Sequence, residues 1–226
     1  MKKLLFAILI LMLAFRAISQ TFKNLNAALA QPHKVIVLDL SNQKINSLPP
    51  AVAEMRNLQK ILLNDNAFTE FPSVIFKCQS LKVVQLNGNQ IKTIPAGISS
   101  LVHLEELEIA FNQFTDIPEE IGQLERLIKL NVSHNLLNRL PQSMQNLKQL
   151  KILDLSYNQF RSFPLVIQSL PALSTLDVSF NKQLKADNLK ENVFPSLRLL
   201  QAKSTSISAE ETQKINTLIP DCLIVF

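Results

Sequence analysis

The strongest signal in this chain is a hydrophobic pattern that repeats every 23 residues. Within each period the order of positions is L-x-x-L-x-L-x-x-N-x-L. Val35 opens the first period, and Leu197 opens the last one, 24 residues after its predecessor. The periods between them open at Leu58, Leu81, Leu104, Leu127, Leu150 and Leu173. Self-similarity at such an interval predicts a solenoid of stacked units.

Each period predicts a short strand followed by a return segment. In the x-L-x-L-x stretch, alternate side chains point to opposite faces of a strand, so the leucines face inward and the x positions face outward. An apolar-proline pair follows in six periods, at Leu48-Pro49, Phe71-Pro72, Ile94-Pro95, Ile117-Pro118, Leu140-Pro141 and Phe163-Pro164. Proline lacks a backbone N–H, so we expect strand pairing to stop there and the chain to return through a turn or short helix.

An asparagine recurs at the bend after each predicted strand. These residues are Asn66, Asn89, Asn112, Asn135, Asn158 and Asn181. A buried amide carries both donors and an acceptor, so each can satisfy backbone groups that the bend leaves unpaired. Gln43 and Thr205 replace it in the first and last periods. We expect the six asparagines to form a structural ladder.

Together these motifs resemble the leucine-rich repeat family, in its 23-residue class with L-P-x-x-I-x-x-L in the second half. That class is known from Ras-suppressor-like proteins, from plant intracellular Ras-group-related proteins and from secreted bacterial proteins. The resemblance covers residues 35–207, about eight repeats. It implies an α/β solenoid, a leucine-rich repeat horseshoe with a parallel concave sheet.

Both ends of the repeat region are typical of caps. Residues 20–34 predict an N-terminal helical cap that ends near a proline. The apolar face of its helix would be made by Phe22, Leu25 and Leu29. Ser208 and Glu211 have the spacing of a capping box. A helix followed by an edge strand over 222–226 would complete a C-terminal helix-strand cap at 208–226.

Residues 1–19 are typical of a signal peptide. Two lysines precede an apolar run of twelve residues, 4–15, which is shorter than the about twenty that a membrane span needs. Small residues then predict cleavage between Ser19 and Gln20. The expected protein is secreted or periplasmic and has no membrane span after signal removal. A buried N-terminal helix and an uncleaved anchor are the alternatives.

Composition excludes several classes of function. Three glycines leave no glycine-rich phosphate loop, and two cysteines with three histidines supply neither a disulfide framework nor a four-cysteine zinc site. We therefore expect no cofactor and no metal. Three of the 23 basic residues lie in the signal, so the remaining chain has 20 basic and 18 acidic residues. That small excess argues against nucleic-acid binding.

The two cysteines fall at core positions of the repeat. Cys78 occupies a column that is apolar in the other periods, and Cys222 lies in the last predicted strand. They are six or seven coils apart, roughly 30 Å at the usual strand spacing. A disulfide needs α-carbons within about 7 Å. We expect both to be free thiols packed as small apolar side chains.

The outward positions of repeats four to seven supply the candidate binding residues. Acidic side chains outnumber lysines in the outward columns, which predicts a mildly acidic concave face. Four aromatic or imidazole side chains follow one another just before the asparagine ladder, as in protein-recognition patches. Packing between neighbouring repeats is the alternative explanation for them. The candidates are Glu106, Glu108, Phe111, Lys129, Asn131, His134, Asp154, Tyr157, Asp177 and Phe180.

These features predict a non-catalytic module that binds a protein or peptide on the concave face. The alternative is a glycan-recognising surface adhesin or scaffold, in which the aromatic rings stack on sugars. A catalytic set could be imagined from Ser133, His134 and Asp154, but an open sheet gives no desolvated pocket to perturb their pKa values. We expect no catalytic residues. The pattern leaves the partner and the oligomeric state open.

Overall fold

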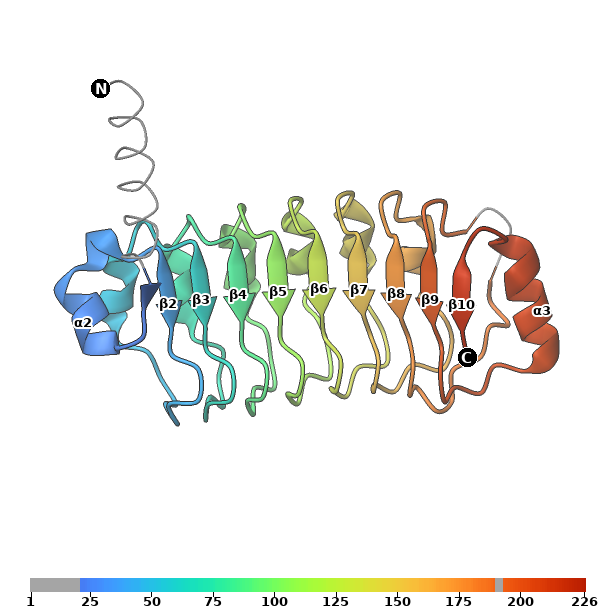
Figure 1. The fold of residues 1–226 in the computed structure, drawn as a ribbon, viewed down its shortest axis with the longest axis horizontal. Coiled ribbons are helices and arrows are strands. Elements are labelled where there is room, and N and C mark those ends of the chain that lie inside the picture. Colours follow the sequence, from blue (N-terminus) through green and yellow to red (C-terminus); the bar gives the residue numbers. More distant parts are fainter. Residues whose placement is uncertain (1–20, 190–192) are drawn as a thin grey trace, which may run out of the picture.

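The computed structural model describes residues 21–189 and 193–226. Within them, ten parallel strands form one open sheet in chain order (Figure 1). The strands are β1 (Thr21–Phe22), β2 (Val37–Asp39), β3 (Lys60–Leu62), β4 (Val83–Gln85), β5 (Glu106–Glu108), β6 (Lys129–Asn131), β7 (Ile152–Asp154), β8 (Thr175–Asp177), β9 (Leu199–Gln201) and β10 (Leu223–Val225). This confirms the parallel solenoid. The predicted signal peptide and its cleavage point lie outside the described residues.

Strand register follows the 23-residue period. Lys60 lies opposite Val83, which is followed at the same interval by Glu106 and Lys129 on the next two strands. Between β8 and β9 the interval is 24, where Thr175 lies opposite Leu199. The middle residue of each repeat strand is fully buried, and these residues are Leu38, Ile61, Val84, Leu107, Leu130, Leu153, Leu176 and Leu200. The predicted inward and outward columns are therefore confirmed.

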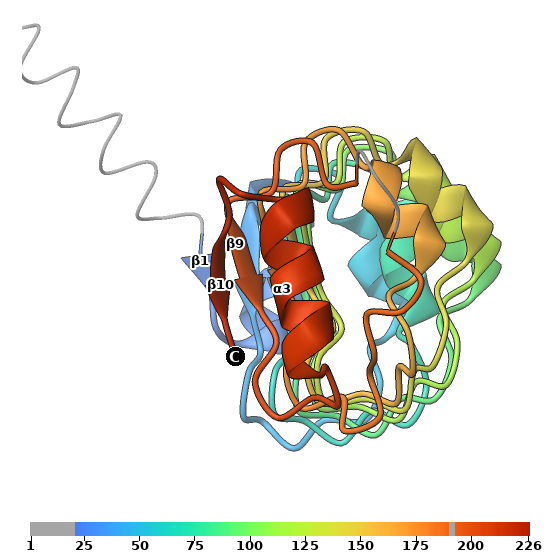
Figure 2. The same cartoon turned by 90° about the vertical axis from the view of Figure 1, so that its right-hand side faces the viewer.

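Opposite the sheet, the chain returns through single turns of 3₁₀ helix (Figure 2). They are η1 (Pro32–Lys34), η2 (Pro50–Glu54), η3 (Ser73–Lys77), η4 (Ala96–Ser100), η5 (Glu119–Gln123), η6 (Gln142–Asn146) and η7 (Leu165–Ser169). A proline of the predicted apolar-proline pairs is the N-cap of each helix from η2 to η7. Each strand from β2 to β7 ends ten residues before its proline, so strand pairing stops earlier than predicted. The fixed φ of the proline prepares the return turn, as predicted.

The asparagine ladder links each repeat to the one before it. The amide nitrogen of Asn112 donates to the carbonyl oxygens of Leu86 at 2.9 Å, Ile109 at 3.2 Å and Ala110 at 3.1 Å. Its oxygen accepts from the backbone N–H of Ile91 at 3.0 Å. The other five ladder residues bond in the same way. The predicted structural role is confirmed.

One continuous apolar core lies between the strands and the 3₁₀ helices. Cys78 is fully buried in it, and burial raises the pKa of its thiol to about 11. Cys222 is half-buried and packs against the same core, and both cysteines are free thiols. A thiol with so high a pKa stays protonated at neutral pH and is a poor nucleophile.

A helix lies at each end of the row of strands (Figure 1). Helix α2 (Leu25–Ala30) follows β1, and α3 (Ala209–Leu218) lies across the other end of the stack (Figure 2). Phe22 was expected on the first helical face, but it lies in β1, because Thr21–Phe22 pairs with β2. The capping box of Ser208 and Glu211 is present. That these ends act as caps stays a prediction.

Candidate functional site

The most unusual group of exposed side chains is a stack of four rings, Phe111, His134, Tyr157 and Phe180, here called the aromatic column. Each residue directly precedes an asparagine of the ladder, one in each of repeats four to seven. Ring centroids lie 3.8, 3.8 and 4.0 Å apart along the stack, with interplanar angles of 15°, 15° and 11°. Phe111 remains 55% exposed and Tyr157 42%. The rings therefore form a continuous ribbon at the surface.

All four residues of the aromatic column have left-handed backbone, with φ between 50° and 59°. The same position in the first three repeats is also left-handed and holds Asn42, Asp65 and Gly88. Glycine, asparagine and aspartate adopt this conformation most readily, and so does histidine, the residue at position 134. Other residues lose roughly 1–2 kcal/mol each, and each stacking contact returns about 0.5–1.5 kcal/mol. Stability alone therefore gives little reason for four rings at these positions.

Stacking decides which part of each ring meets solvent. His134 and Tyr157 have a neighbouring ring over both faces, while Phe111 and Phe180 have one face covered by the stack. The edges remain accessible, and ring edges carry the positive end of the quadrupole. Burial between its neighbours lowers the pKa of His134, although Asp154 acts in the opposite direction.

An open groove of about 1000 Å³ runs beside the aromatic column, across repeats four to seven. The column and three ladder asparagines form one side of its lining. Further lining residues are Leu136, Asn138, Gln159, Arg161, Lys182 and Gln183. Among the described residues that line the groove, none is acidic. The surface is hollowed along the loop edge of the sheet, not across the strands.

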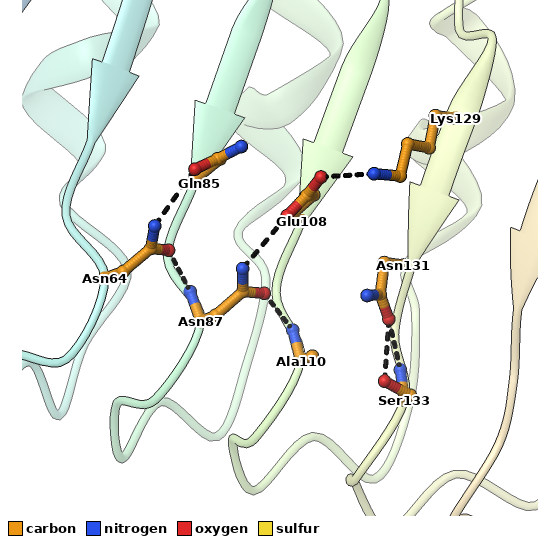
Figure 3. Close-up of polar contacts among 8 residues, drawn as sticks. All are labelled: Asn64, Gln85, Asn87, Glu108, Ala110, Lys129, Asn131 and Ser133. Carbon is orange, nitrogen blue, oxygen red and sulfur yellow. Dashed lines mark hydrogen bonds and ion pairs between the residues drawn. The ribbon is translucent and has the colours of Figure 1, made fainter.

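The candidate residues on the strands, here called the strand face, are Glu106, Glu108, Lys129, Asn131, Asp154 and Asp177. Glu108, Lys129 and Asn131 take part in the polar contacts that Figure 3 shows. Glu108 accepts a hydrogen bond from the side-chain amide of Asn87 at 3.1 Å and forms an ion pair with Lys129 at 2.5 Å. The Glu108 side chain is only 14% exposed, and its bond to Lys129 raises the pKa of that lysine. The Asn131 oxygen accepts from the N–H and hydroxyl of Ser133. These contacts leave Glu108 and Asn131 less free to meet a partner than the sequence suggested.

Two predicted carboxylates lie opposite each other on β7 and β8. Asp154 and Asp177 each accept from the backbone N–H of a serine two residues later, at 2.9 and 2.8 Å. Burial raises the pKa of Asp177, and the neighbouring Asp154 adds to this effect. They form an acidic pair next to the aromatic column. Glu106, on β5, is half-buried and lies in register with Lys129.

The imagined catalytic set is not assembled. The Ser133 hydroxyl donates to Asn131 at 2.8 Å, and Ser133 is buried. His134 lies between Phe111 and Tyr157 in the stack. Within residues 21–189 and 193–226, no group of three or more His, Cys, Asp or Glu side chains could hold a metal ion. No helix in these ranges has the length and apolar character to cross a membrane.

Sequence reasoning found the column and missed the groove. Leu136 and Lys182 directly follow ladder asparagines, at a position where three other repeats carry glutamine. Arg161 lies three residues after Asn158. A comparison of these post-ladder positions could have found the departures, but their meeting around one hollow depends on the path of the loops.

Comparison with known proteins places the repeat pattern in a family. A model described as a leucine-rich repeat region matches residues 17–135, and a model described as a leucine rich repeat matches residues 125–182. A search of curated proteins gives no match. Among solved structures, a leucine-rich repeat protein of Leptospira interrogans is 27% identical with a TM-score of 0.69, and the alignment covers 86% of this chain and 55% of that one.

Two further solved structures share the fold. The ectodomain of the plant receptor kinase GASSHO1/SCHENGEN3 of Arabidopsis thaliana, in complex with CASPARIAN STRIP INTEGRITY FACTOR 2, is 27% identical with a TM-score of 0.67; the match covers 88% of this chain and 24% of that one. An internalin of Listeria monocytogenes is 19% identical with a TM-score of 0.65, and the match covers 87% of this chain and 62% of the internalin. This chain thus spans about half of the Leptospira protein and a quarter of the plant ectodomain. With its repeats, its ladder and a family model matching over half its length, the chain belongs to the leucine-rich repeat family.

Proposed function

We propose that this chain is a non-catalytic module that binds a protein or peptide along repeats four to seven. The aromatic column supplies the apolar anchors, and the strand face beside it supplies charge complementarity through Glu106, Asp154 and Asp177. Lys129 and Asn131, held by their own hydrogen bonds, set the register of the bound chain. The plant receptor ectodomain at 27% identity, solved in complex with CASPARIAN STRIP INTEGRITY FACTOR 2, supports a binding role for a domain of such repeats.

One observation carries this proposal. The fold requires left-handed backbone before each position of the ladder, whether asparagine or Gln43 occupies it, and repeats one to three meet that requirement with residues suited to it. Repeats four to seven place Phe111, His134, Tyr157 and Phe180 there instead and leave them exposed or half-buried. Unfavourable local backbone that is kept at a surface is typical of binding sites. Exposed aromatics in a row are enriched at protein interfaces.

The same geometry disfavours the glycan-binding alternative. Sugars stack on the faces of aromatic rings, and the inner faces of the column are covered by neighbouring rings at 3.8–4.0 Å. Only Phe111 and Phe180, the two end rings, have a face that the stack leaves uncovered. A glycan array probed with the purified protein separates the two functions, because a protein-binding module leaves the array blank.

The binding test uses peptides selected from a random display library on the wild-type protein. In the variant Tyr157→Asn with Phe180→Asn, we expect their affinity to fall at least about tenfold, since two anchors are lost. Asparagine is the natural residue of the first repeat at this position, so the free energy of unfolding should change by no more than about 1 kcal/mol. Affinity follows from fluorescence anisotropy and stability from urea unfolding.

A matched control removes exposed apolar side chains elsewhere. Val102 and Leu165 are 50% and 57% exposed and lie outside the column. The variant Val102→Asn with Leu165→Asn should keep the affinity. The column would serve only in packing if the Tyr157 and Phe180 variant keeps its affinity. The same conclusion would follow if its loss of stability is as large as its loss of affinity.

We further propose that the protein is exported, to the periplasm or outside the cell. The order of charged, apolar and small residues in the first nineteen positions supports this. N-terminal sequencing of the protein recovered from the medium or envelope fraction should give Gln20 as its first residue. An N-terminus at Met1 or Lys2 would contradict cleavage.

A further inference from the structure

The groove beside the aromatic column holds positive charge without acidic counterparts. Arg161 and Lys182 come from repeats six and seven, line the groove and are exposed. The ion pairs among the described residues join Lys82 to Glu105, Lys129 to Glu108 and Arg139 to Asp116, so neither groove cation takes part in one. Two unpaired cations in a hollow attract anions by focusing the local field.

The rest of the lining is suited to the same ligand chemistry. Asn138, Gln159 and Gln183 can donate to carbonyl or carboxylate oxygens. The ring edges of the column carry partial positive charge, so they can also contact the carbonyl oxygens of a bound segment. Base stacking, on which single-stranded nucleic acids depend, requires free ring faces, and the inner rings of the column have none.

We propose that the groove holds an extended acidic segment of a protein partner, with its carboxylates at Arg161 and Lys182 and its backbone carbonyls against the ring edges. Four repeats at a strand spacing of about 4.8 Å span roughly 14 Å, enough for four or five extended residues. An adjoining hollow shares Arg161 and adds Lys185 and Asp187, whose charges offset each other. The proposal rests on the proposed function for the kind of partner, and it adds the chemistry by which the partner is chosen.

This surface is distinct from the strand face, which carries Glu106, Asp154 and Asp177. An acidic segment on the strand face would meet like charges, which costs affinity. The groove and the strand face therefore select segments of opposite charge, and a partner that covers both carries an acidic stretch beside a basic or neutral one.

The test uses fluorescein-labelled hexapeptides of glutamate, of lysine and of alternating glycine and serine, with anisotropy measured on the full chain at 50 mM salt. We expect saturable binding of the glutamate peptide alone. Replacing Arg161→Gln with Lys182→Gln should weaken that binding about tenfold, and raising the salt to 0.5 M should weaken it in the wild type through screening. Both side chains are exposed, so the variant should keep the wild-type unfolding midpoint.

A matched control makes the same change of charge elsewhere. Arg126 and Lys148 are exposed and line no part of the groove, so Arg126→Gln with Lys148→Gln should bind the glutamate peptide as the wild type does. Equal weakening in both double variants would mean a general charge effect and overturn the proposal. Preference for the lysine peptide, or tighter binding of a single-stranded RNA hexamer, would also overturn it.

This outcome is separable from that of the proposed function. If display-selected peptides are lost in the Tyr157 and Phe180 variant while the glutamate peptide ignores Arg161 and Lys182, the binding module stands and the acidic ligand does not. If the selected peptides bind the Tyr157 and Phe180 variant as they bind the wild type, while binding of the glutamate peptide depends on Arg161 and Lys182, the acidic ligand stands and the role of the aromatic column in binding does not.

Discussion

The first three repeats and the next four solve the same backbone problem with different residues. Before each ladder position, which is held by Gln43 in the first repeat and by asparagine in the next six, the chain turns through a left-handed residue. In the first group this residue is Asn42, Asp65 or Gly88. In the second group it is one of the four rings of the aromatic column, stacked at 3.8–4.0 Å. The first group shows what the fold needs at this position. The second group shows that aromatic side chains at this position are not required by the fold, and the functional proposal is based on their presence there.

The ladder is common to both groups of repeats, and its removal should cost the most stability. Asn135 donates to the carbonyls of Ile109, Val132 and Ser133 and accepts from the N–H of Phe114. Replacing Asn135→Ala leaves these buried backbone groups unpaired, so we expect a loss of about 3 kcal/mol of unfolding free energy. Urea unfolding measures it.

The control for that prediction is in the same repeat. Asn138 is exposed, and Asn138→Ala should change stability by less than about 0.5 kcal/mol. A ladder variant no less stable than this control would mean that the amide bonds contribute little to the stack.

A ring placed in the first group of repeats would separate the cost of the left-handed backbone from the gain of stacking. Gly88 has φ +66°, and an added Cβ would lie 2.3 Å from the Oδ1 atom of the Asp65 side chain. Gly88→Ala should therefore lose at least about 1–2 kcal/mol, because the left-handed backbone is strained and the Asp65 side chain has to move. Gly88→Phe carries the same strain but can stack on Phe111, which should recover about 1 kcal/mol of it.

The informative quantity is the difference between the two Gly88 variants, measured by urea unfolding. A phenylalanine variant less stable than the alanine variant would show that stacking does not offset the backbone cost. In that case the rings of repeats four to seven would be still harder to explain by packing.

The smallest expected effect is the pH dependence of the column. Burial lowers the pKa of His134 below its ordinary value of 6.5. As the pH falls through 6.5, the imidazole becomes protonated in the unfolded chain while it is still neutral in the folded chain, so the free energy of unfolding decreases. Between pH 7.5 and pH 5.5 the wild type should lose more unfolding free energy than His134→Asn does. Parallel changes in the two proteins would show that the stack does not disfavour the charged imidazole.

The sequence allowed much of the fold to be predicted and only part of the candidate site. The strand positions, the 3₁₀ return after each proline, the ladder and the order of the aromatic column all follow from the period. The assignment of Phe22 to a helix was wrong, because two residues at the N-terminal side of the repeats pair with β2 instead. The neutralisation of Glu108 by Lys129 and the groove lined by Arg161 were not predicted.

The 23-residue period was enough to predict the stack, because a unit that cannot bury its own leucines must share a core with its neighbours, and the leucines recur at that fixed interval. The contacts between polar and aromatic side chains of adjacent repeats became visible in the three-dimensional structure. Strand spacing brings four rings face to face, so that their edges are what a partner encounters. It also joins Glu108 to Lys129 across two strands, while the loops set Arg161 and Lys182 around one hollow. Those contacts depend on distances between repeats, which a one-dimensional pattern does not contain.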